Sequence, residues 1–176
     1  MLAPTLNAPP THQKWRLDTT WQLLADDEHD TERLGAALAA ELEPGSVVGL
    51  VGDLGAGKTR LVRAVAVARG TDPRDVISPT FVLVQEYAGS PAICHADAWR
   101  LVAETEFVDL GLDERQDEGA ILLVEWADRV AGVLPEDRLT IEIEITGETS
   151  RRFFVSAGGP ASGELSARLR ERVEHP

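Results

Sequence analysis

The chain has 176 residues, with 17 Lys or Arg against 30 Asp or Glu, so its formal net charge is −13. This length suits one domain with a single core, and the acidic balance disfavours general DNA binding, which needs a basic surface. No apolar run is long enough to span a bilayer, and a single cysteine, Cys94, excludes an internal disulfide. We therefore expect a soluble cytoplasmic protein with no membrane segment.

The first fifty residues predict a tail, a strand, a helix and a buried strand, in that order. Residues 1–13 hold three prolines and no periodic apolar pattern, which is typical of a flexible tail. Residues 15–24 resemble a strand. Residues 26–42 begin with acidic residues and continue with apolar residues at helical spacing, which predicts a helix. The valine-rich run 46–51 predicts a strand that is buried on both faces of a sheet.

The middle of the chain predicts a helix followed by a hairpin. The helical pattern runs from the end of a glycine-rich loop to about Arg69. Residues 80–87 and 91–97 flank an Ala-Gly-Ser turn, which predicts two antiparallel strands. Residues 104–110 predict a short helix that ends at Gly111.

The last third predicts three strands and a helix. Residues 120–124 form a second wholly apolar run, which ends at Glu125. Residues 139–145 alternate between apolar and polar side chains, so one face of this strand should point inward. The residues expected on that face are Leu139, Ile141, Ile143 and Ile145. Residues 151–155 can pair back on this strand, and a helix is expected from about 163 to 172.

Buried strands that alternate with helices predict an α/β sandwich. We expect a mixed, partly parallel central sheet with an antiparallel extension and flanking helices. The expected organisation is a tail over residues 1–13, one domain over 14–158, and a C-terminal helix or tail over 159–176.

One motif carries chemistry. The segment GDLGAGKT follows the buried strand 46–51 and matches the phosphate-binding pattern GxxxxGK[ST] of P-loop NTPases. Its residues are Gly52, Asp53, Leu54, Gly55, Ala56, Gly57, Lys58 and Thr59. The glycines let consecutive N–H groups point at phosphate oxygens, and the next helix directs its free N–H groups at the same anion. Lys58 should reach the β- and γ-phosphates and Thr59 should hold Mg²⁺, which predicts a magnesium nucleotide site.

Such a site also needs a carboxylate at the end of a neighbouring strand, and the sequence offers two. Asp97 ends the predicted strand 91–97, and Glu125 follows the apolar run 120–124. Either could hold Mg²⁺, directly or through water, while the other orients or deprotonates a nucleophile. One of them could instead cap a strand or pair with an arginine.

Residues near these motifs have alternative interpretations. Thr80 could sense a γ-phosphate, although Ser-Pro-Thr is also an ordinary turn. His95 shares a strand face with Asp97, so it could orient that carboxylate or the nucleophile, or be only structural. Cys94 lies on the opposite face and is expected to be a small buried residue. Trp126, directly after Glu125, is the tryptophan most closely linked to the motif.

Composition and length separate the classes of phosphate-loop protein. Ordinary GTPases recognise guanine with an Asn-Lys-x-Asp segment, and the only asparagine, Asn7, cannot supply it. A small-molecule kinase fits the length and is the alternative. However, residues 98–120 are acidic and contain no glycine-flanked basic lid.

The ordered set GDLGAGKT, SPTF, EY, HADAWRL and LLVEWADR resembles the TsaE (YjeE) family, bacterial P-loop ATPases of tRNA threonylcarbamoyladenosine biosynthesis. The resemblance runs from about Thr31 to Arg152. It implies ATP and Mg²⁺ as cofactors and slow ATP hydrolysis. It also implies a TsaB–TsaD heterodimer as partner, in which TsaD transfers the threonylcarbamoyl group, so that tRNA is reached mainly through the partners.

The same resemblance implies roles for single residues. The loop from Asp53 to Thr59 would hold the phosphates, with Lys58 acting on the transferred group. Glu125 would be the second protein ligand of Mg²⁺, and Trp126 would lie beside the nucleotide.

Two further segments carry family roles. Thr80 would belong to a switch-like loop. Asp97 would lie with His95 and Arg100 near the γ-phosphate, and Asp97 is our candidate for the group that prepares the attacking water. Trp99 stands where the family usually has tyrosine, which keeps an aromatic ring but not a hydroxyl.

Overall fold

The structure is a computed structural model that describes residues 21–175, so the predicted tail 1–13 lies outside the described residues. The described elements in chain order are β1 (Trp21–Ala25), α1 (Glu28–Glu41), β2 (Val47–Val51), α2 (Lys58–Ala68), β3 (Val84–Tyr87), β4 (Ile93–Asp97), α3 (Glu104–Val108), α4 (Leu112–Asp117), β5 (Ile121–Glu125), the 3-10 helix η2 (Ala127–Val130), β6 (Leu139–Ile145), β7 (Arg151–Ala157) and α5 (Pro160–Glu174).

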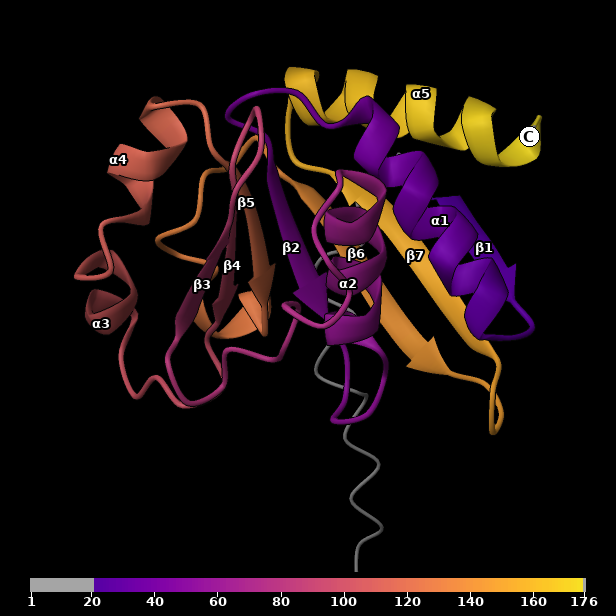
Figure 1. The fold of residues 1–176 in the computed structure, drawn as a ribbon, viewed down its shortest axis with the longest axis horizontal. Coiled ribbons are helices and arrows are strands. Elements are labelled where there is room, and N and C mark those ends of the chain that lie inside the picture. Colours follow the sequence, from indigo (N-terminus) through magenta and orange to yellow (C-terminus); the bar gives the residue numbers. More distant parts are fainter. Residues whose placement is uncertain (1–20, 176) are drawn as a thin grey trace, which may run out of the picture.

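The strands form one seven-stranded sheet in the order β1-β7-β6-β2-β5-β4-β3 (Figure 1). Its centre is parallel, since β2 pairs in parallel with β5 and β6, and β4 pairs in parallel with β5. Strands β3, β7 and β1 pair antiparallel with their neighbours. The predicted mixed sheet with an antiparallel extension is therefore confirmed.

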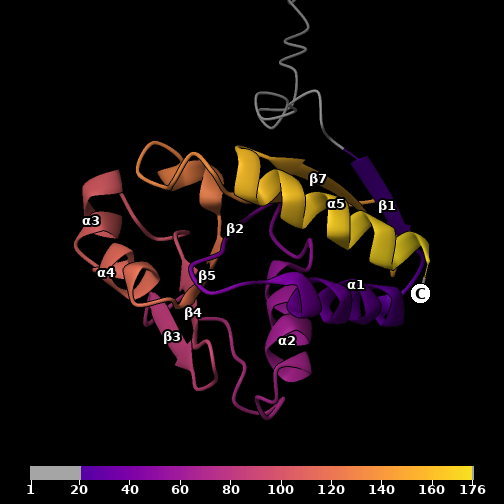
Figure 2. The ribbon, with the colours of Figure 1, turned by 90° about the horizontal axis from the view of Figure 1, so that it is seen from above.

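Helices cover both faces of this sheet. Helices α1 and α2 lie on one side and α3 and α4 on the other (Figure 2). One core cluster joins the sheet to α1, α2 and α5, and a second joins its other face to α3, α4 and η2. Every residue of β2, β4 and β5 is buried, because both faces of these strands are covered. Cys94 lies in the second cluster and is buried, as predicted.

Two glycines permit close packing beside the central strand. A Cβ added to Gly35 on α1 would overlap the methyl group of Ala64 on α2. A Cβ on Gly49 of β2 would lie 2.9 Å from the Cβ of Ala127 in η2. The first approach holds α2 close to α1, and the second holds η2 close to β2. The segments that begin α2 and η2 contribute to the site described below. No helix in the described part of the chain is both long and apolar enough to cross a membrane.

The predicted strand 80–87 is wrong in its first half, since only residues 84–87 are a strand. The N–H groups of Val82 and Leu83 both donate to the carbonyl of Pro79, which closes a turn. Leu83 has φ 67°, a left-handed conformation that does not continue a strand. Because the chain turns here, Thr80 lies in a loop instead of in the sheet.

Other differences are smaller. Ile145, predicted to face inward, is 46% exposed, because it is the last residue of β6 and pairs with Arg151 where the hairpin extends past the helices (Figure 1). Helix α5 begins at Pro160, earlier than predicted, because proline suits the first helical turn. Helix α4 and η2 were not predicted, since six and four residues are too few to show a period. The predicted strand 15–24 is described only from Trp21 onward, as β1.

Candidate functional site

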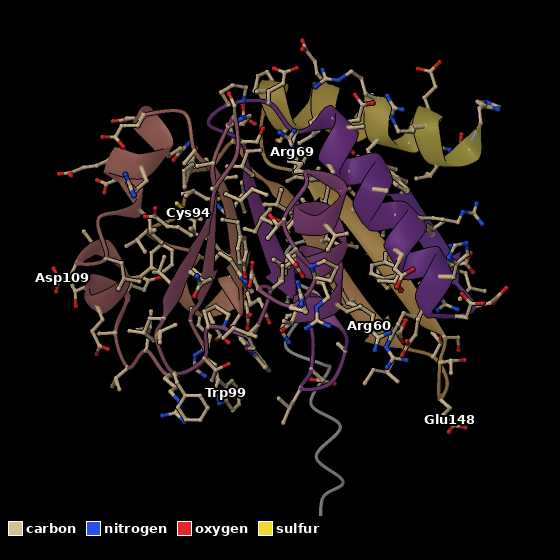
Figure 3. All side chains as sticks on the ribbon, in the orientation of Figure 1. Arg60, Arg69, Cys94, Trp99, Asp109 and Glu148 are labelled. Carbon is tan, nitrogen blue, oxygen red and sulfur yellow. The ribbon has the colours of Figure 1, made fainter. Side chains whose placement is uncertain are left out.

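The glycine-rich loop lies at the carboxyl ends of the parallel strands, between β2 and α2, at the lower edge of the sheet in Figure 1. A cavity of about 320 Å³ opens there. In Figure 3 the side chains of Arg60, Trp99 and Glu148 lie in the same lower half of the molecule. The cavity is lined by Glu28, Thr31, Leu54, Gly55, Ala56, Gly57, Lys58, Thr59, Arg60, Ser78, Thr80, Asp97, Glu125, Trp126, Glu148, Thr149 and Arg151.

The loop has the backbone that an anion site requires. Gly57 has φ 108°, a conformation that favours glycine, and it is the N-cap of α2 without a side-chain cap. The first N–H groups of this 11-residue helix are therefore not taken up by a capping side chain and can be given to an anion. Gly52 has φ 143°, and a Cβ there would lie 2.5 Å from the carbonyl oxygen of Ile143. Only glycine fits at this close approach.

Lys58 is buried and points back along the loop. Its Nζ donates to the carbonyl oxygens of Gly52 at 2.6 Å and of Asp53 at 3.0 Å. Burial lowers the pKa of Lys58, and the negative charges of Glu125, Asp97, Asp128 and Asp53 oppose that shift only in part. Gly52 and Asp53, predicted to touch the nucleotide, are not among the described residues that line the cavity; their carbonyl groups hold the ammonium instead.

The ring of Trp126 covers the Lys58 ammonium, with Nζ 3.6 Å from the ring centroid, a cation–π contact. The residue has φ 58°, a left-handed conformation that costs about 1–2 kcal/mol outside glycine. The chain turns sharply here, directly after β5. The centroid of the Trp126 ring also lies 4.3 Å from the centroid of the Trp99 ring.

Glu125 and Thr59 lie together beside the loop. The Thr59 hydroxyl donates to Oε1 of Glu125 at 2.7 Å, and Nε2 of His95 lies 2.8 Å from the same oxygen. Glu125 is buried with a relative exposure of 3%. The two residues predicted to hold Mg²⁺, which are 66 positions apart in the chain, are thus in direct contact.

Asp97 occupies the end of the next strand and is held by the loop after α2. Its Oδ2 accepts a hydrogen bond from the Thr80 hydroxyl at 2.6 Å, and its Oδ1 accepts one from the backbone N–H of Trp99 at 2.8 Å. The Thr80 hydroxyl donates its single hydrogen to Asp97. In the 2.7 Å contact between the hydroxyls of Thr80 and Ser78, Ser78 is therefore the donor.

His95 and Arg100 have other partners than the sequence suggested. His95 shares a strand face with Asp97, but its two ring nitrogens contact Tyr87 and Glu125. The expectation that His95 orients Asp97 is therefore corrected, because the neighbouring strands β3 and β5 bring other polar groups closer. Arg100 stacks over the ring of Phe81, 4.3 Å from its centroid, and is not among the described lining residues.

Arg151 was missed by the sequence analysis. Its Nε donates to the carbonyl of Ala56 at 2.9 Å and its Nη2 to that of Gly55 at 3.3 Å, so this lining residue also supports the glycine-rich loop. Its Nη1 donates to carbonyls of the turn between β6 and β7, the nearest being Ser150 at 2.8 Å. The sequence predicted only that Arg151 lies in the strand 151–155. Its contact with the glycine-rich loop could not be predicted, because no local pattern links that strand to residues 95 positions earlier.

The oxygen atoms at the carboxyl ends of the parallel strands suit a hard cation that a bound ligand also coordinates. Thr59 and Glu125 contribute oxygen atoms, which Mg²⁺ prefers. Within residues 21–175, no group of three or more His, Cys, Asp or Glu side chains could hold a metal alone. A cation here would therefore take further oxygens from a phosphate ligand or from water, as Mg²⁺ does in nucleotide sites.

Comparisons with known proteins agree with this geometry. Residues 25–153 match the family model described as "Threonylcarbamoyl adenosine biosynthesis protein TsaE". A Bacillus subtilis protein named tRNA threonylcarbamoyladenosine biosynthesis protein TsaE is 39% identical over 140 residues, 79% of this chain and 85% of the relative. A Treponema pallidum protein of the same name is 37% identical over 127 residues, 72% of this chain and 93% of the relative.

A solved structure is similar as well. The crystal structure of Bacillus subtilis YdiB aligns with a TM-score of 0.70 and 30% sequence identity, over 86% of this chain and 95% of that chain. The predicted fold, a P-loop NTPase sandwich, is thereby confirmed.

Proposed function

The chain belongs to the TsaE family, and from this premise we propose that it is a magnesium-dependent ATPase subunit serving threonylcarbamoyl modification of tRNA. The family acts in the biosynthesis of threonylcarbamoyladenosine in tRNA. The main support for magnesium-dependent ATP hydrolysis is the contact of Thr59 with Glu125. This contact lies next to Lys58, whose ammonium is covered by the ring of Trp126.

The glycine-rich loop would bind the triphosphate. N–H groups of the loop and of the first turn of α2 would donate to phosphate oxygens. Lys58 would exchange its two carbonyl acceptors, on Gly52 and Asp53, for oxygens of the transferred phosphoryl group. Its positive charge, held in a poorly solvated position, would stabilise the negative charge that develops in the transition state.

Thr59 and Glu125 would hold the magnesium ion. When bound, the ion neutralises charge on the β- and γ-phosphates. The hydroxyl of Thr59 and the carboxylate of Glu125 are oxygen donors placed side by side, which fits this role. His95 keeps the carboxylate in place through its contact with Oε1.

Asp97 is our candidate for the group that orients the attacking water. It lies at the carboxyl end of β4, opposite Glu125 in the register of β4 and β5. Thr80, which is bonded to Asp97, would be the residue of the loop after α2 that responds to the γ-phosphate. For this response the Thr80 hydroxyl would leave Asp97, which would free Oδ2 for water.

We infer that the partner is a TsaB–TsaD heterodimer and that tRNA is reached mainly through it. The formal charge of −13 supports indirect contact, because direct binding of the tRNA backbone by this chain would need a basic surface.

Three measurements test the proposal: nucleotide titration, a pull-down and ATP hydrolysis by variants. Isothermal titration with ATP and Mg²⁺ should show binding by the wild type, and a pull-down in ATP should recover a TsaB–TsaD pair. Glu125→Ala should need more magnesium and hydrolyse ATP more slowly, whereas Asp97→Asn should bind ATP but hydrolyse it slowly. Glu164→Gln, an exposed substitution on α5, serves as the control and should behave as wild type.

Other results would refute it. Wild-type hydrolysis in Glu125→Ala would remove the magnesium role of that residue. Transfer of the γ-phosphate to a metabolite instead of water would identify a kinase.

A further inference from the structure

We propose that Tyr87 is a positioning residue that orients the Glu125 carboxylate through His95. The inference rests on the proposed function, in which Glu125 holds the cation. The hydroxyl of Tyr87 lies 3.0 Å from Nδ1 of His95, and Nε2 of His95 lies 2.8 Å from Oε1 of Glu125. Relative exposures of 3%, 0% and 3% show that this row of Tyr87, His95 and Glu125 is shielded from solvent.

Three neighbouring strands hold the row together. Tyr87 ends the edge strand β3, His95 lies in β4, and Glu125 ends β5. Tyr87 belongs to the core cluster beneath α1 and α2, on the face of the sheet to which α2 brings Thr59. The row therefore runs from the edge of the sheet inward to the predicted magnesium ligands.

Hydrogen-bond chemistry assigns the direction of each contact. An ionised carboxylate only accepts, so Nε2 of His95 must carry the hydrogen that points at Glu125. In a neutral imidazole the other nitrogen, Nδ1, is then an acceptor, so the Tyr87 hydroxyl must donate to it. Burial, together with the charge of Glu125, raises the pKa of Tyr87 to about 12, so the hydroxyl keeps its hydrogen at neutral pH.

The consequence for Glu125 is a fixed orientation. Its Oε1 accepts hydrogen bonds from both His95 and Thr59, whereas none of the described residues donates to its Oε2. Oε2 is thus the oxygen that the protein leaves for a cation. Without the Tyr87 hydroxyl, His95 could move its hydrogen to Nδ1. Nε2 would then face Oε1 as a second acceptor, and the carboxylate would lose the donor that holds it.

The substitution Tyr87→Phe isolates this effect, because it removes one oxygen and leaves the ring in the core. The first readout needs neither nucleotide nor metal. In protein labelled with ¹⁵N, a long-range ¹H–¹⁵N correlation spectrum of the His95 ring reports which nitrogen carries the hydrogen. The His95 signals are assigned by their loss in His95→Gln. We expect hydrogen on Nε2 in the wild type and a mixture of both tautomers in Tyr87→Phe.

The second readout is the magnesium concentration that gives half-maximal ATP hydrolysis. Groups that orient metal ligands usually contribute about 10–100-fold to metal affinity or activity. We expect Tyr87→Phe to raise this concentration about tenfold, with metal-free nucleotide binding unchanged. His95→Gln should raise this magnesium concentration to a similar extent. The double variant Tyr87→Phe/His95→Gln should need no more magnesium than His95→Gln alone, because both residues act through the same contact.

Ile93→Val is the matched control. Ile93 pairs with Tyr87 in the register of β3 and β4 and lies in the same core. The substitution therefore removes buried apolar volume beside Tyr87 but no hydrogen-bonding group of the row. It should keep the tautomer and the magnesium requirement of the wild type.

Three outcomes overturn the inference: an unchanged tautomer in Tyr87→Phe, a changed tautomer with an unchanged magnesium requirement, or the same effect in Ile93→Val. If Tyr87→Phe fails to fold, an unchanged magnesium requirement in folded His95→Gln overturns it equally. Absence of ATP binding by the wild type refutes the proposed function instead, so the two failures are distinguishable.

Discussion

The hydroxyl of Thr80 donates a 2.6 Å hydrogen bond to Oδ2 of Asp97, which ties the loop after α2 to the carboxyl end of β4. The turn at Pro79 is what makes this contact accessible, because it takes Thr80 out of the sheet. The Thr80 hydroxyl can exchange this hydrogen bond for one to a ligand while other contacts of the loop, such as that of Arg63 with the Val76 carbonyl, stay in place. This property is expected of a segment that responds to a phosphate.

Thr80→Val keeps the side-chain shape and removes the hydroxyl. We expect hydrolysis to fall about 10–100-fold, because Asp97 loses its partner and the loop loses its phosphate contact, while ADP affinity changes less than threefold. Single-turnover hydrolysis and ADP titration separate the two effects. Thr105→Val, on the exposed side of α3, is the control. Equal losses of hydrolysis and ADP affinity would argue against a role confined to the γ-phosphate.

Lys58→Met should weaken nucleotide binding strongly without lowering stability. Loss of a charged hydrogen-bond donor to phosphate should cost about 3 kcal/mol, roughly 100-fold in affinity. Burial lowers the pKa of Lys58 in the folded chain, so the folded state holds this proton less tightly than the unfolded state does. Removing the charge relieves this cost, whereas the carbonyls of Gly52 and Asp53 lose their donor, so the two effects offset each other. The melting temperature of the nucleotide-free protein should therefore stay close to that of the wild type. A clear fall in melting temperature with retained affinity would contradict both parts.

Arg151 and Arg152 are adjacent on β7 and form a matched pair. Arg151 donates to the carbonyls of Ala56 and Gly55, whereas Arg152 forms an exposed ion pair with Glu144 at 3.3 Å. Arg151→Met should weaken ATP binding about tenfold and destabilise the fold by about 1–2 kcal/mol, since the carbonyls of the loop lose their donor. Arg152→Met should stay within about 0.5 kcal/mol. Urea denaturation and ATP titration measure both; equal effects of the two substitutions would contradict the assignment.

Glu41 makes the packing of α1 on α5 dependent on pH. Its side chain is 10% exposed and pairs with Arg168 and Arg172. Burial acts to raise the pKa of Glu41, but hydrogen bonds from Arg172 and Arg168 outweigh it and hold the pKa below 4.5. A carboxyl whose pKa is lowered by folding stabilises the protein above its unfolded pKa, and this contribution is lost as the pH falls through the folded value.

The test compares the wild type with Glu41→Gln in urea. We expect the wild type to be more stable at pH 7 by about 1 kcal/mol, because both arginines are partly exposed and screened by solvent. The difference should shrink as the pH falls below 4.5. Glu174→Gln, which breaks an exposed pair with Arg170, should show no such dependence. A difference that does not shrink as the pH falls below 4.5 would disprove the linkage.

Much of the fold could be predicted because its signals are local. The wholly apolar runs 46–51 and 120–124 became β2 and β5, since strands covered on both faces need no polar alternation. The alternation of residues 139–145 predicted β6, apart from Ile145 at its exposed end. The short helix predicted over residues 104–110 is confirmed as α3, whereas α4 and η2 were missed, since so few residues leave little periodic pattern.

The sequence by itself determined the loop chemistry of this protein: the glycines, Lys58 and Thr59 are contiguous, and their spacing alone predicts a phosphate site. Only the tertiary structure decided which groups support that site. The partner of His95 is Glu125 and not Asp97, and the loop carbonyls are held by Arg151. The physical reason is that strand order and register place side chains tens of residues apart within hydrogen-bond distance, and no local spacing encodes that arrangement.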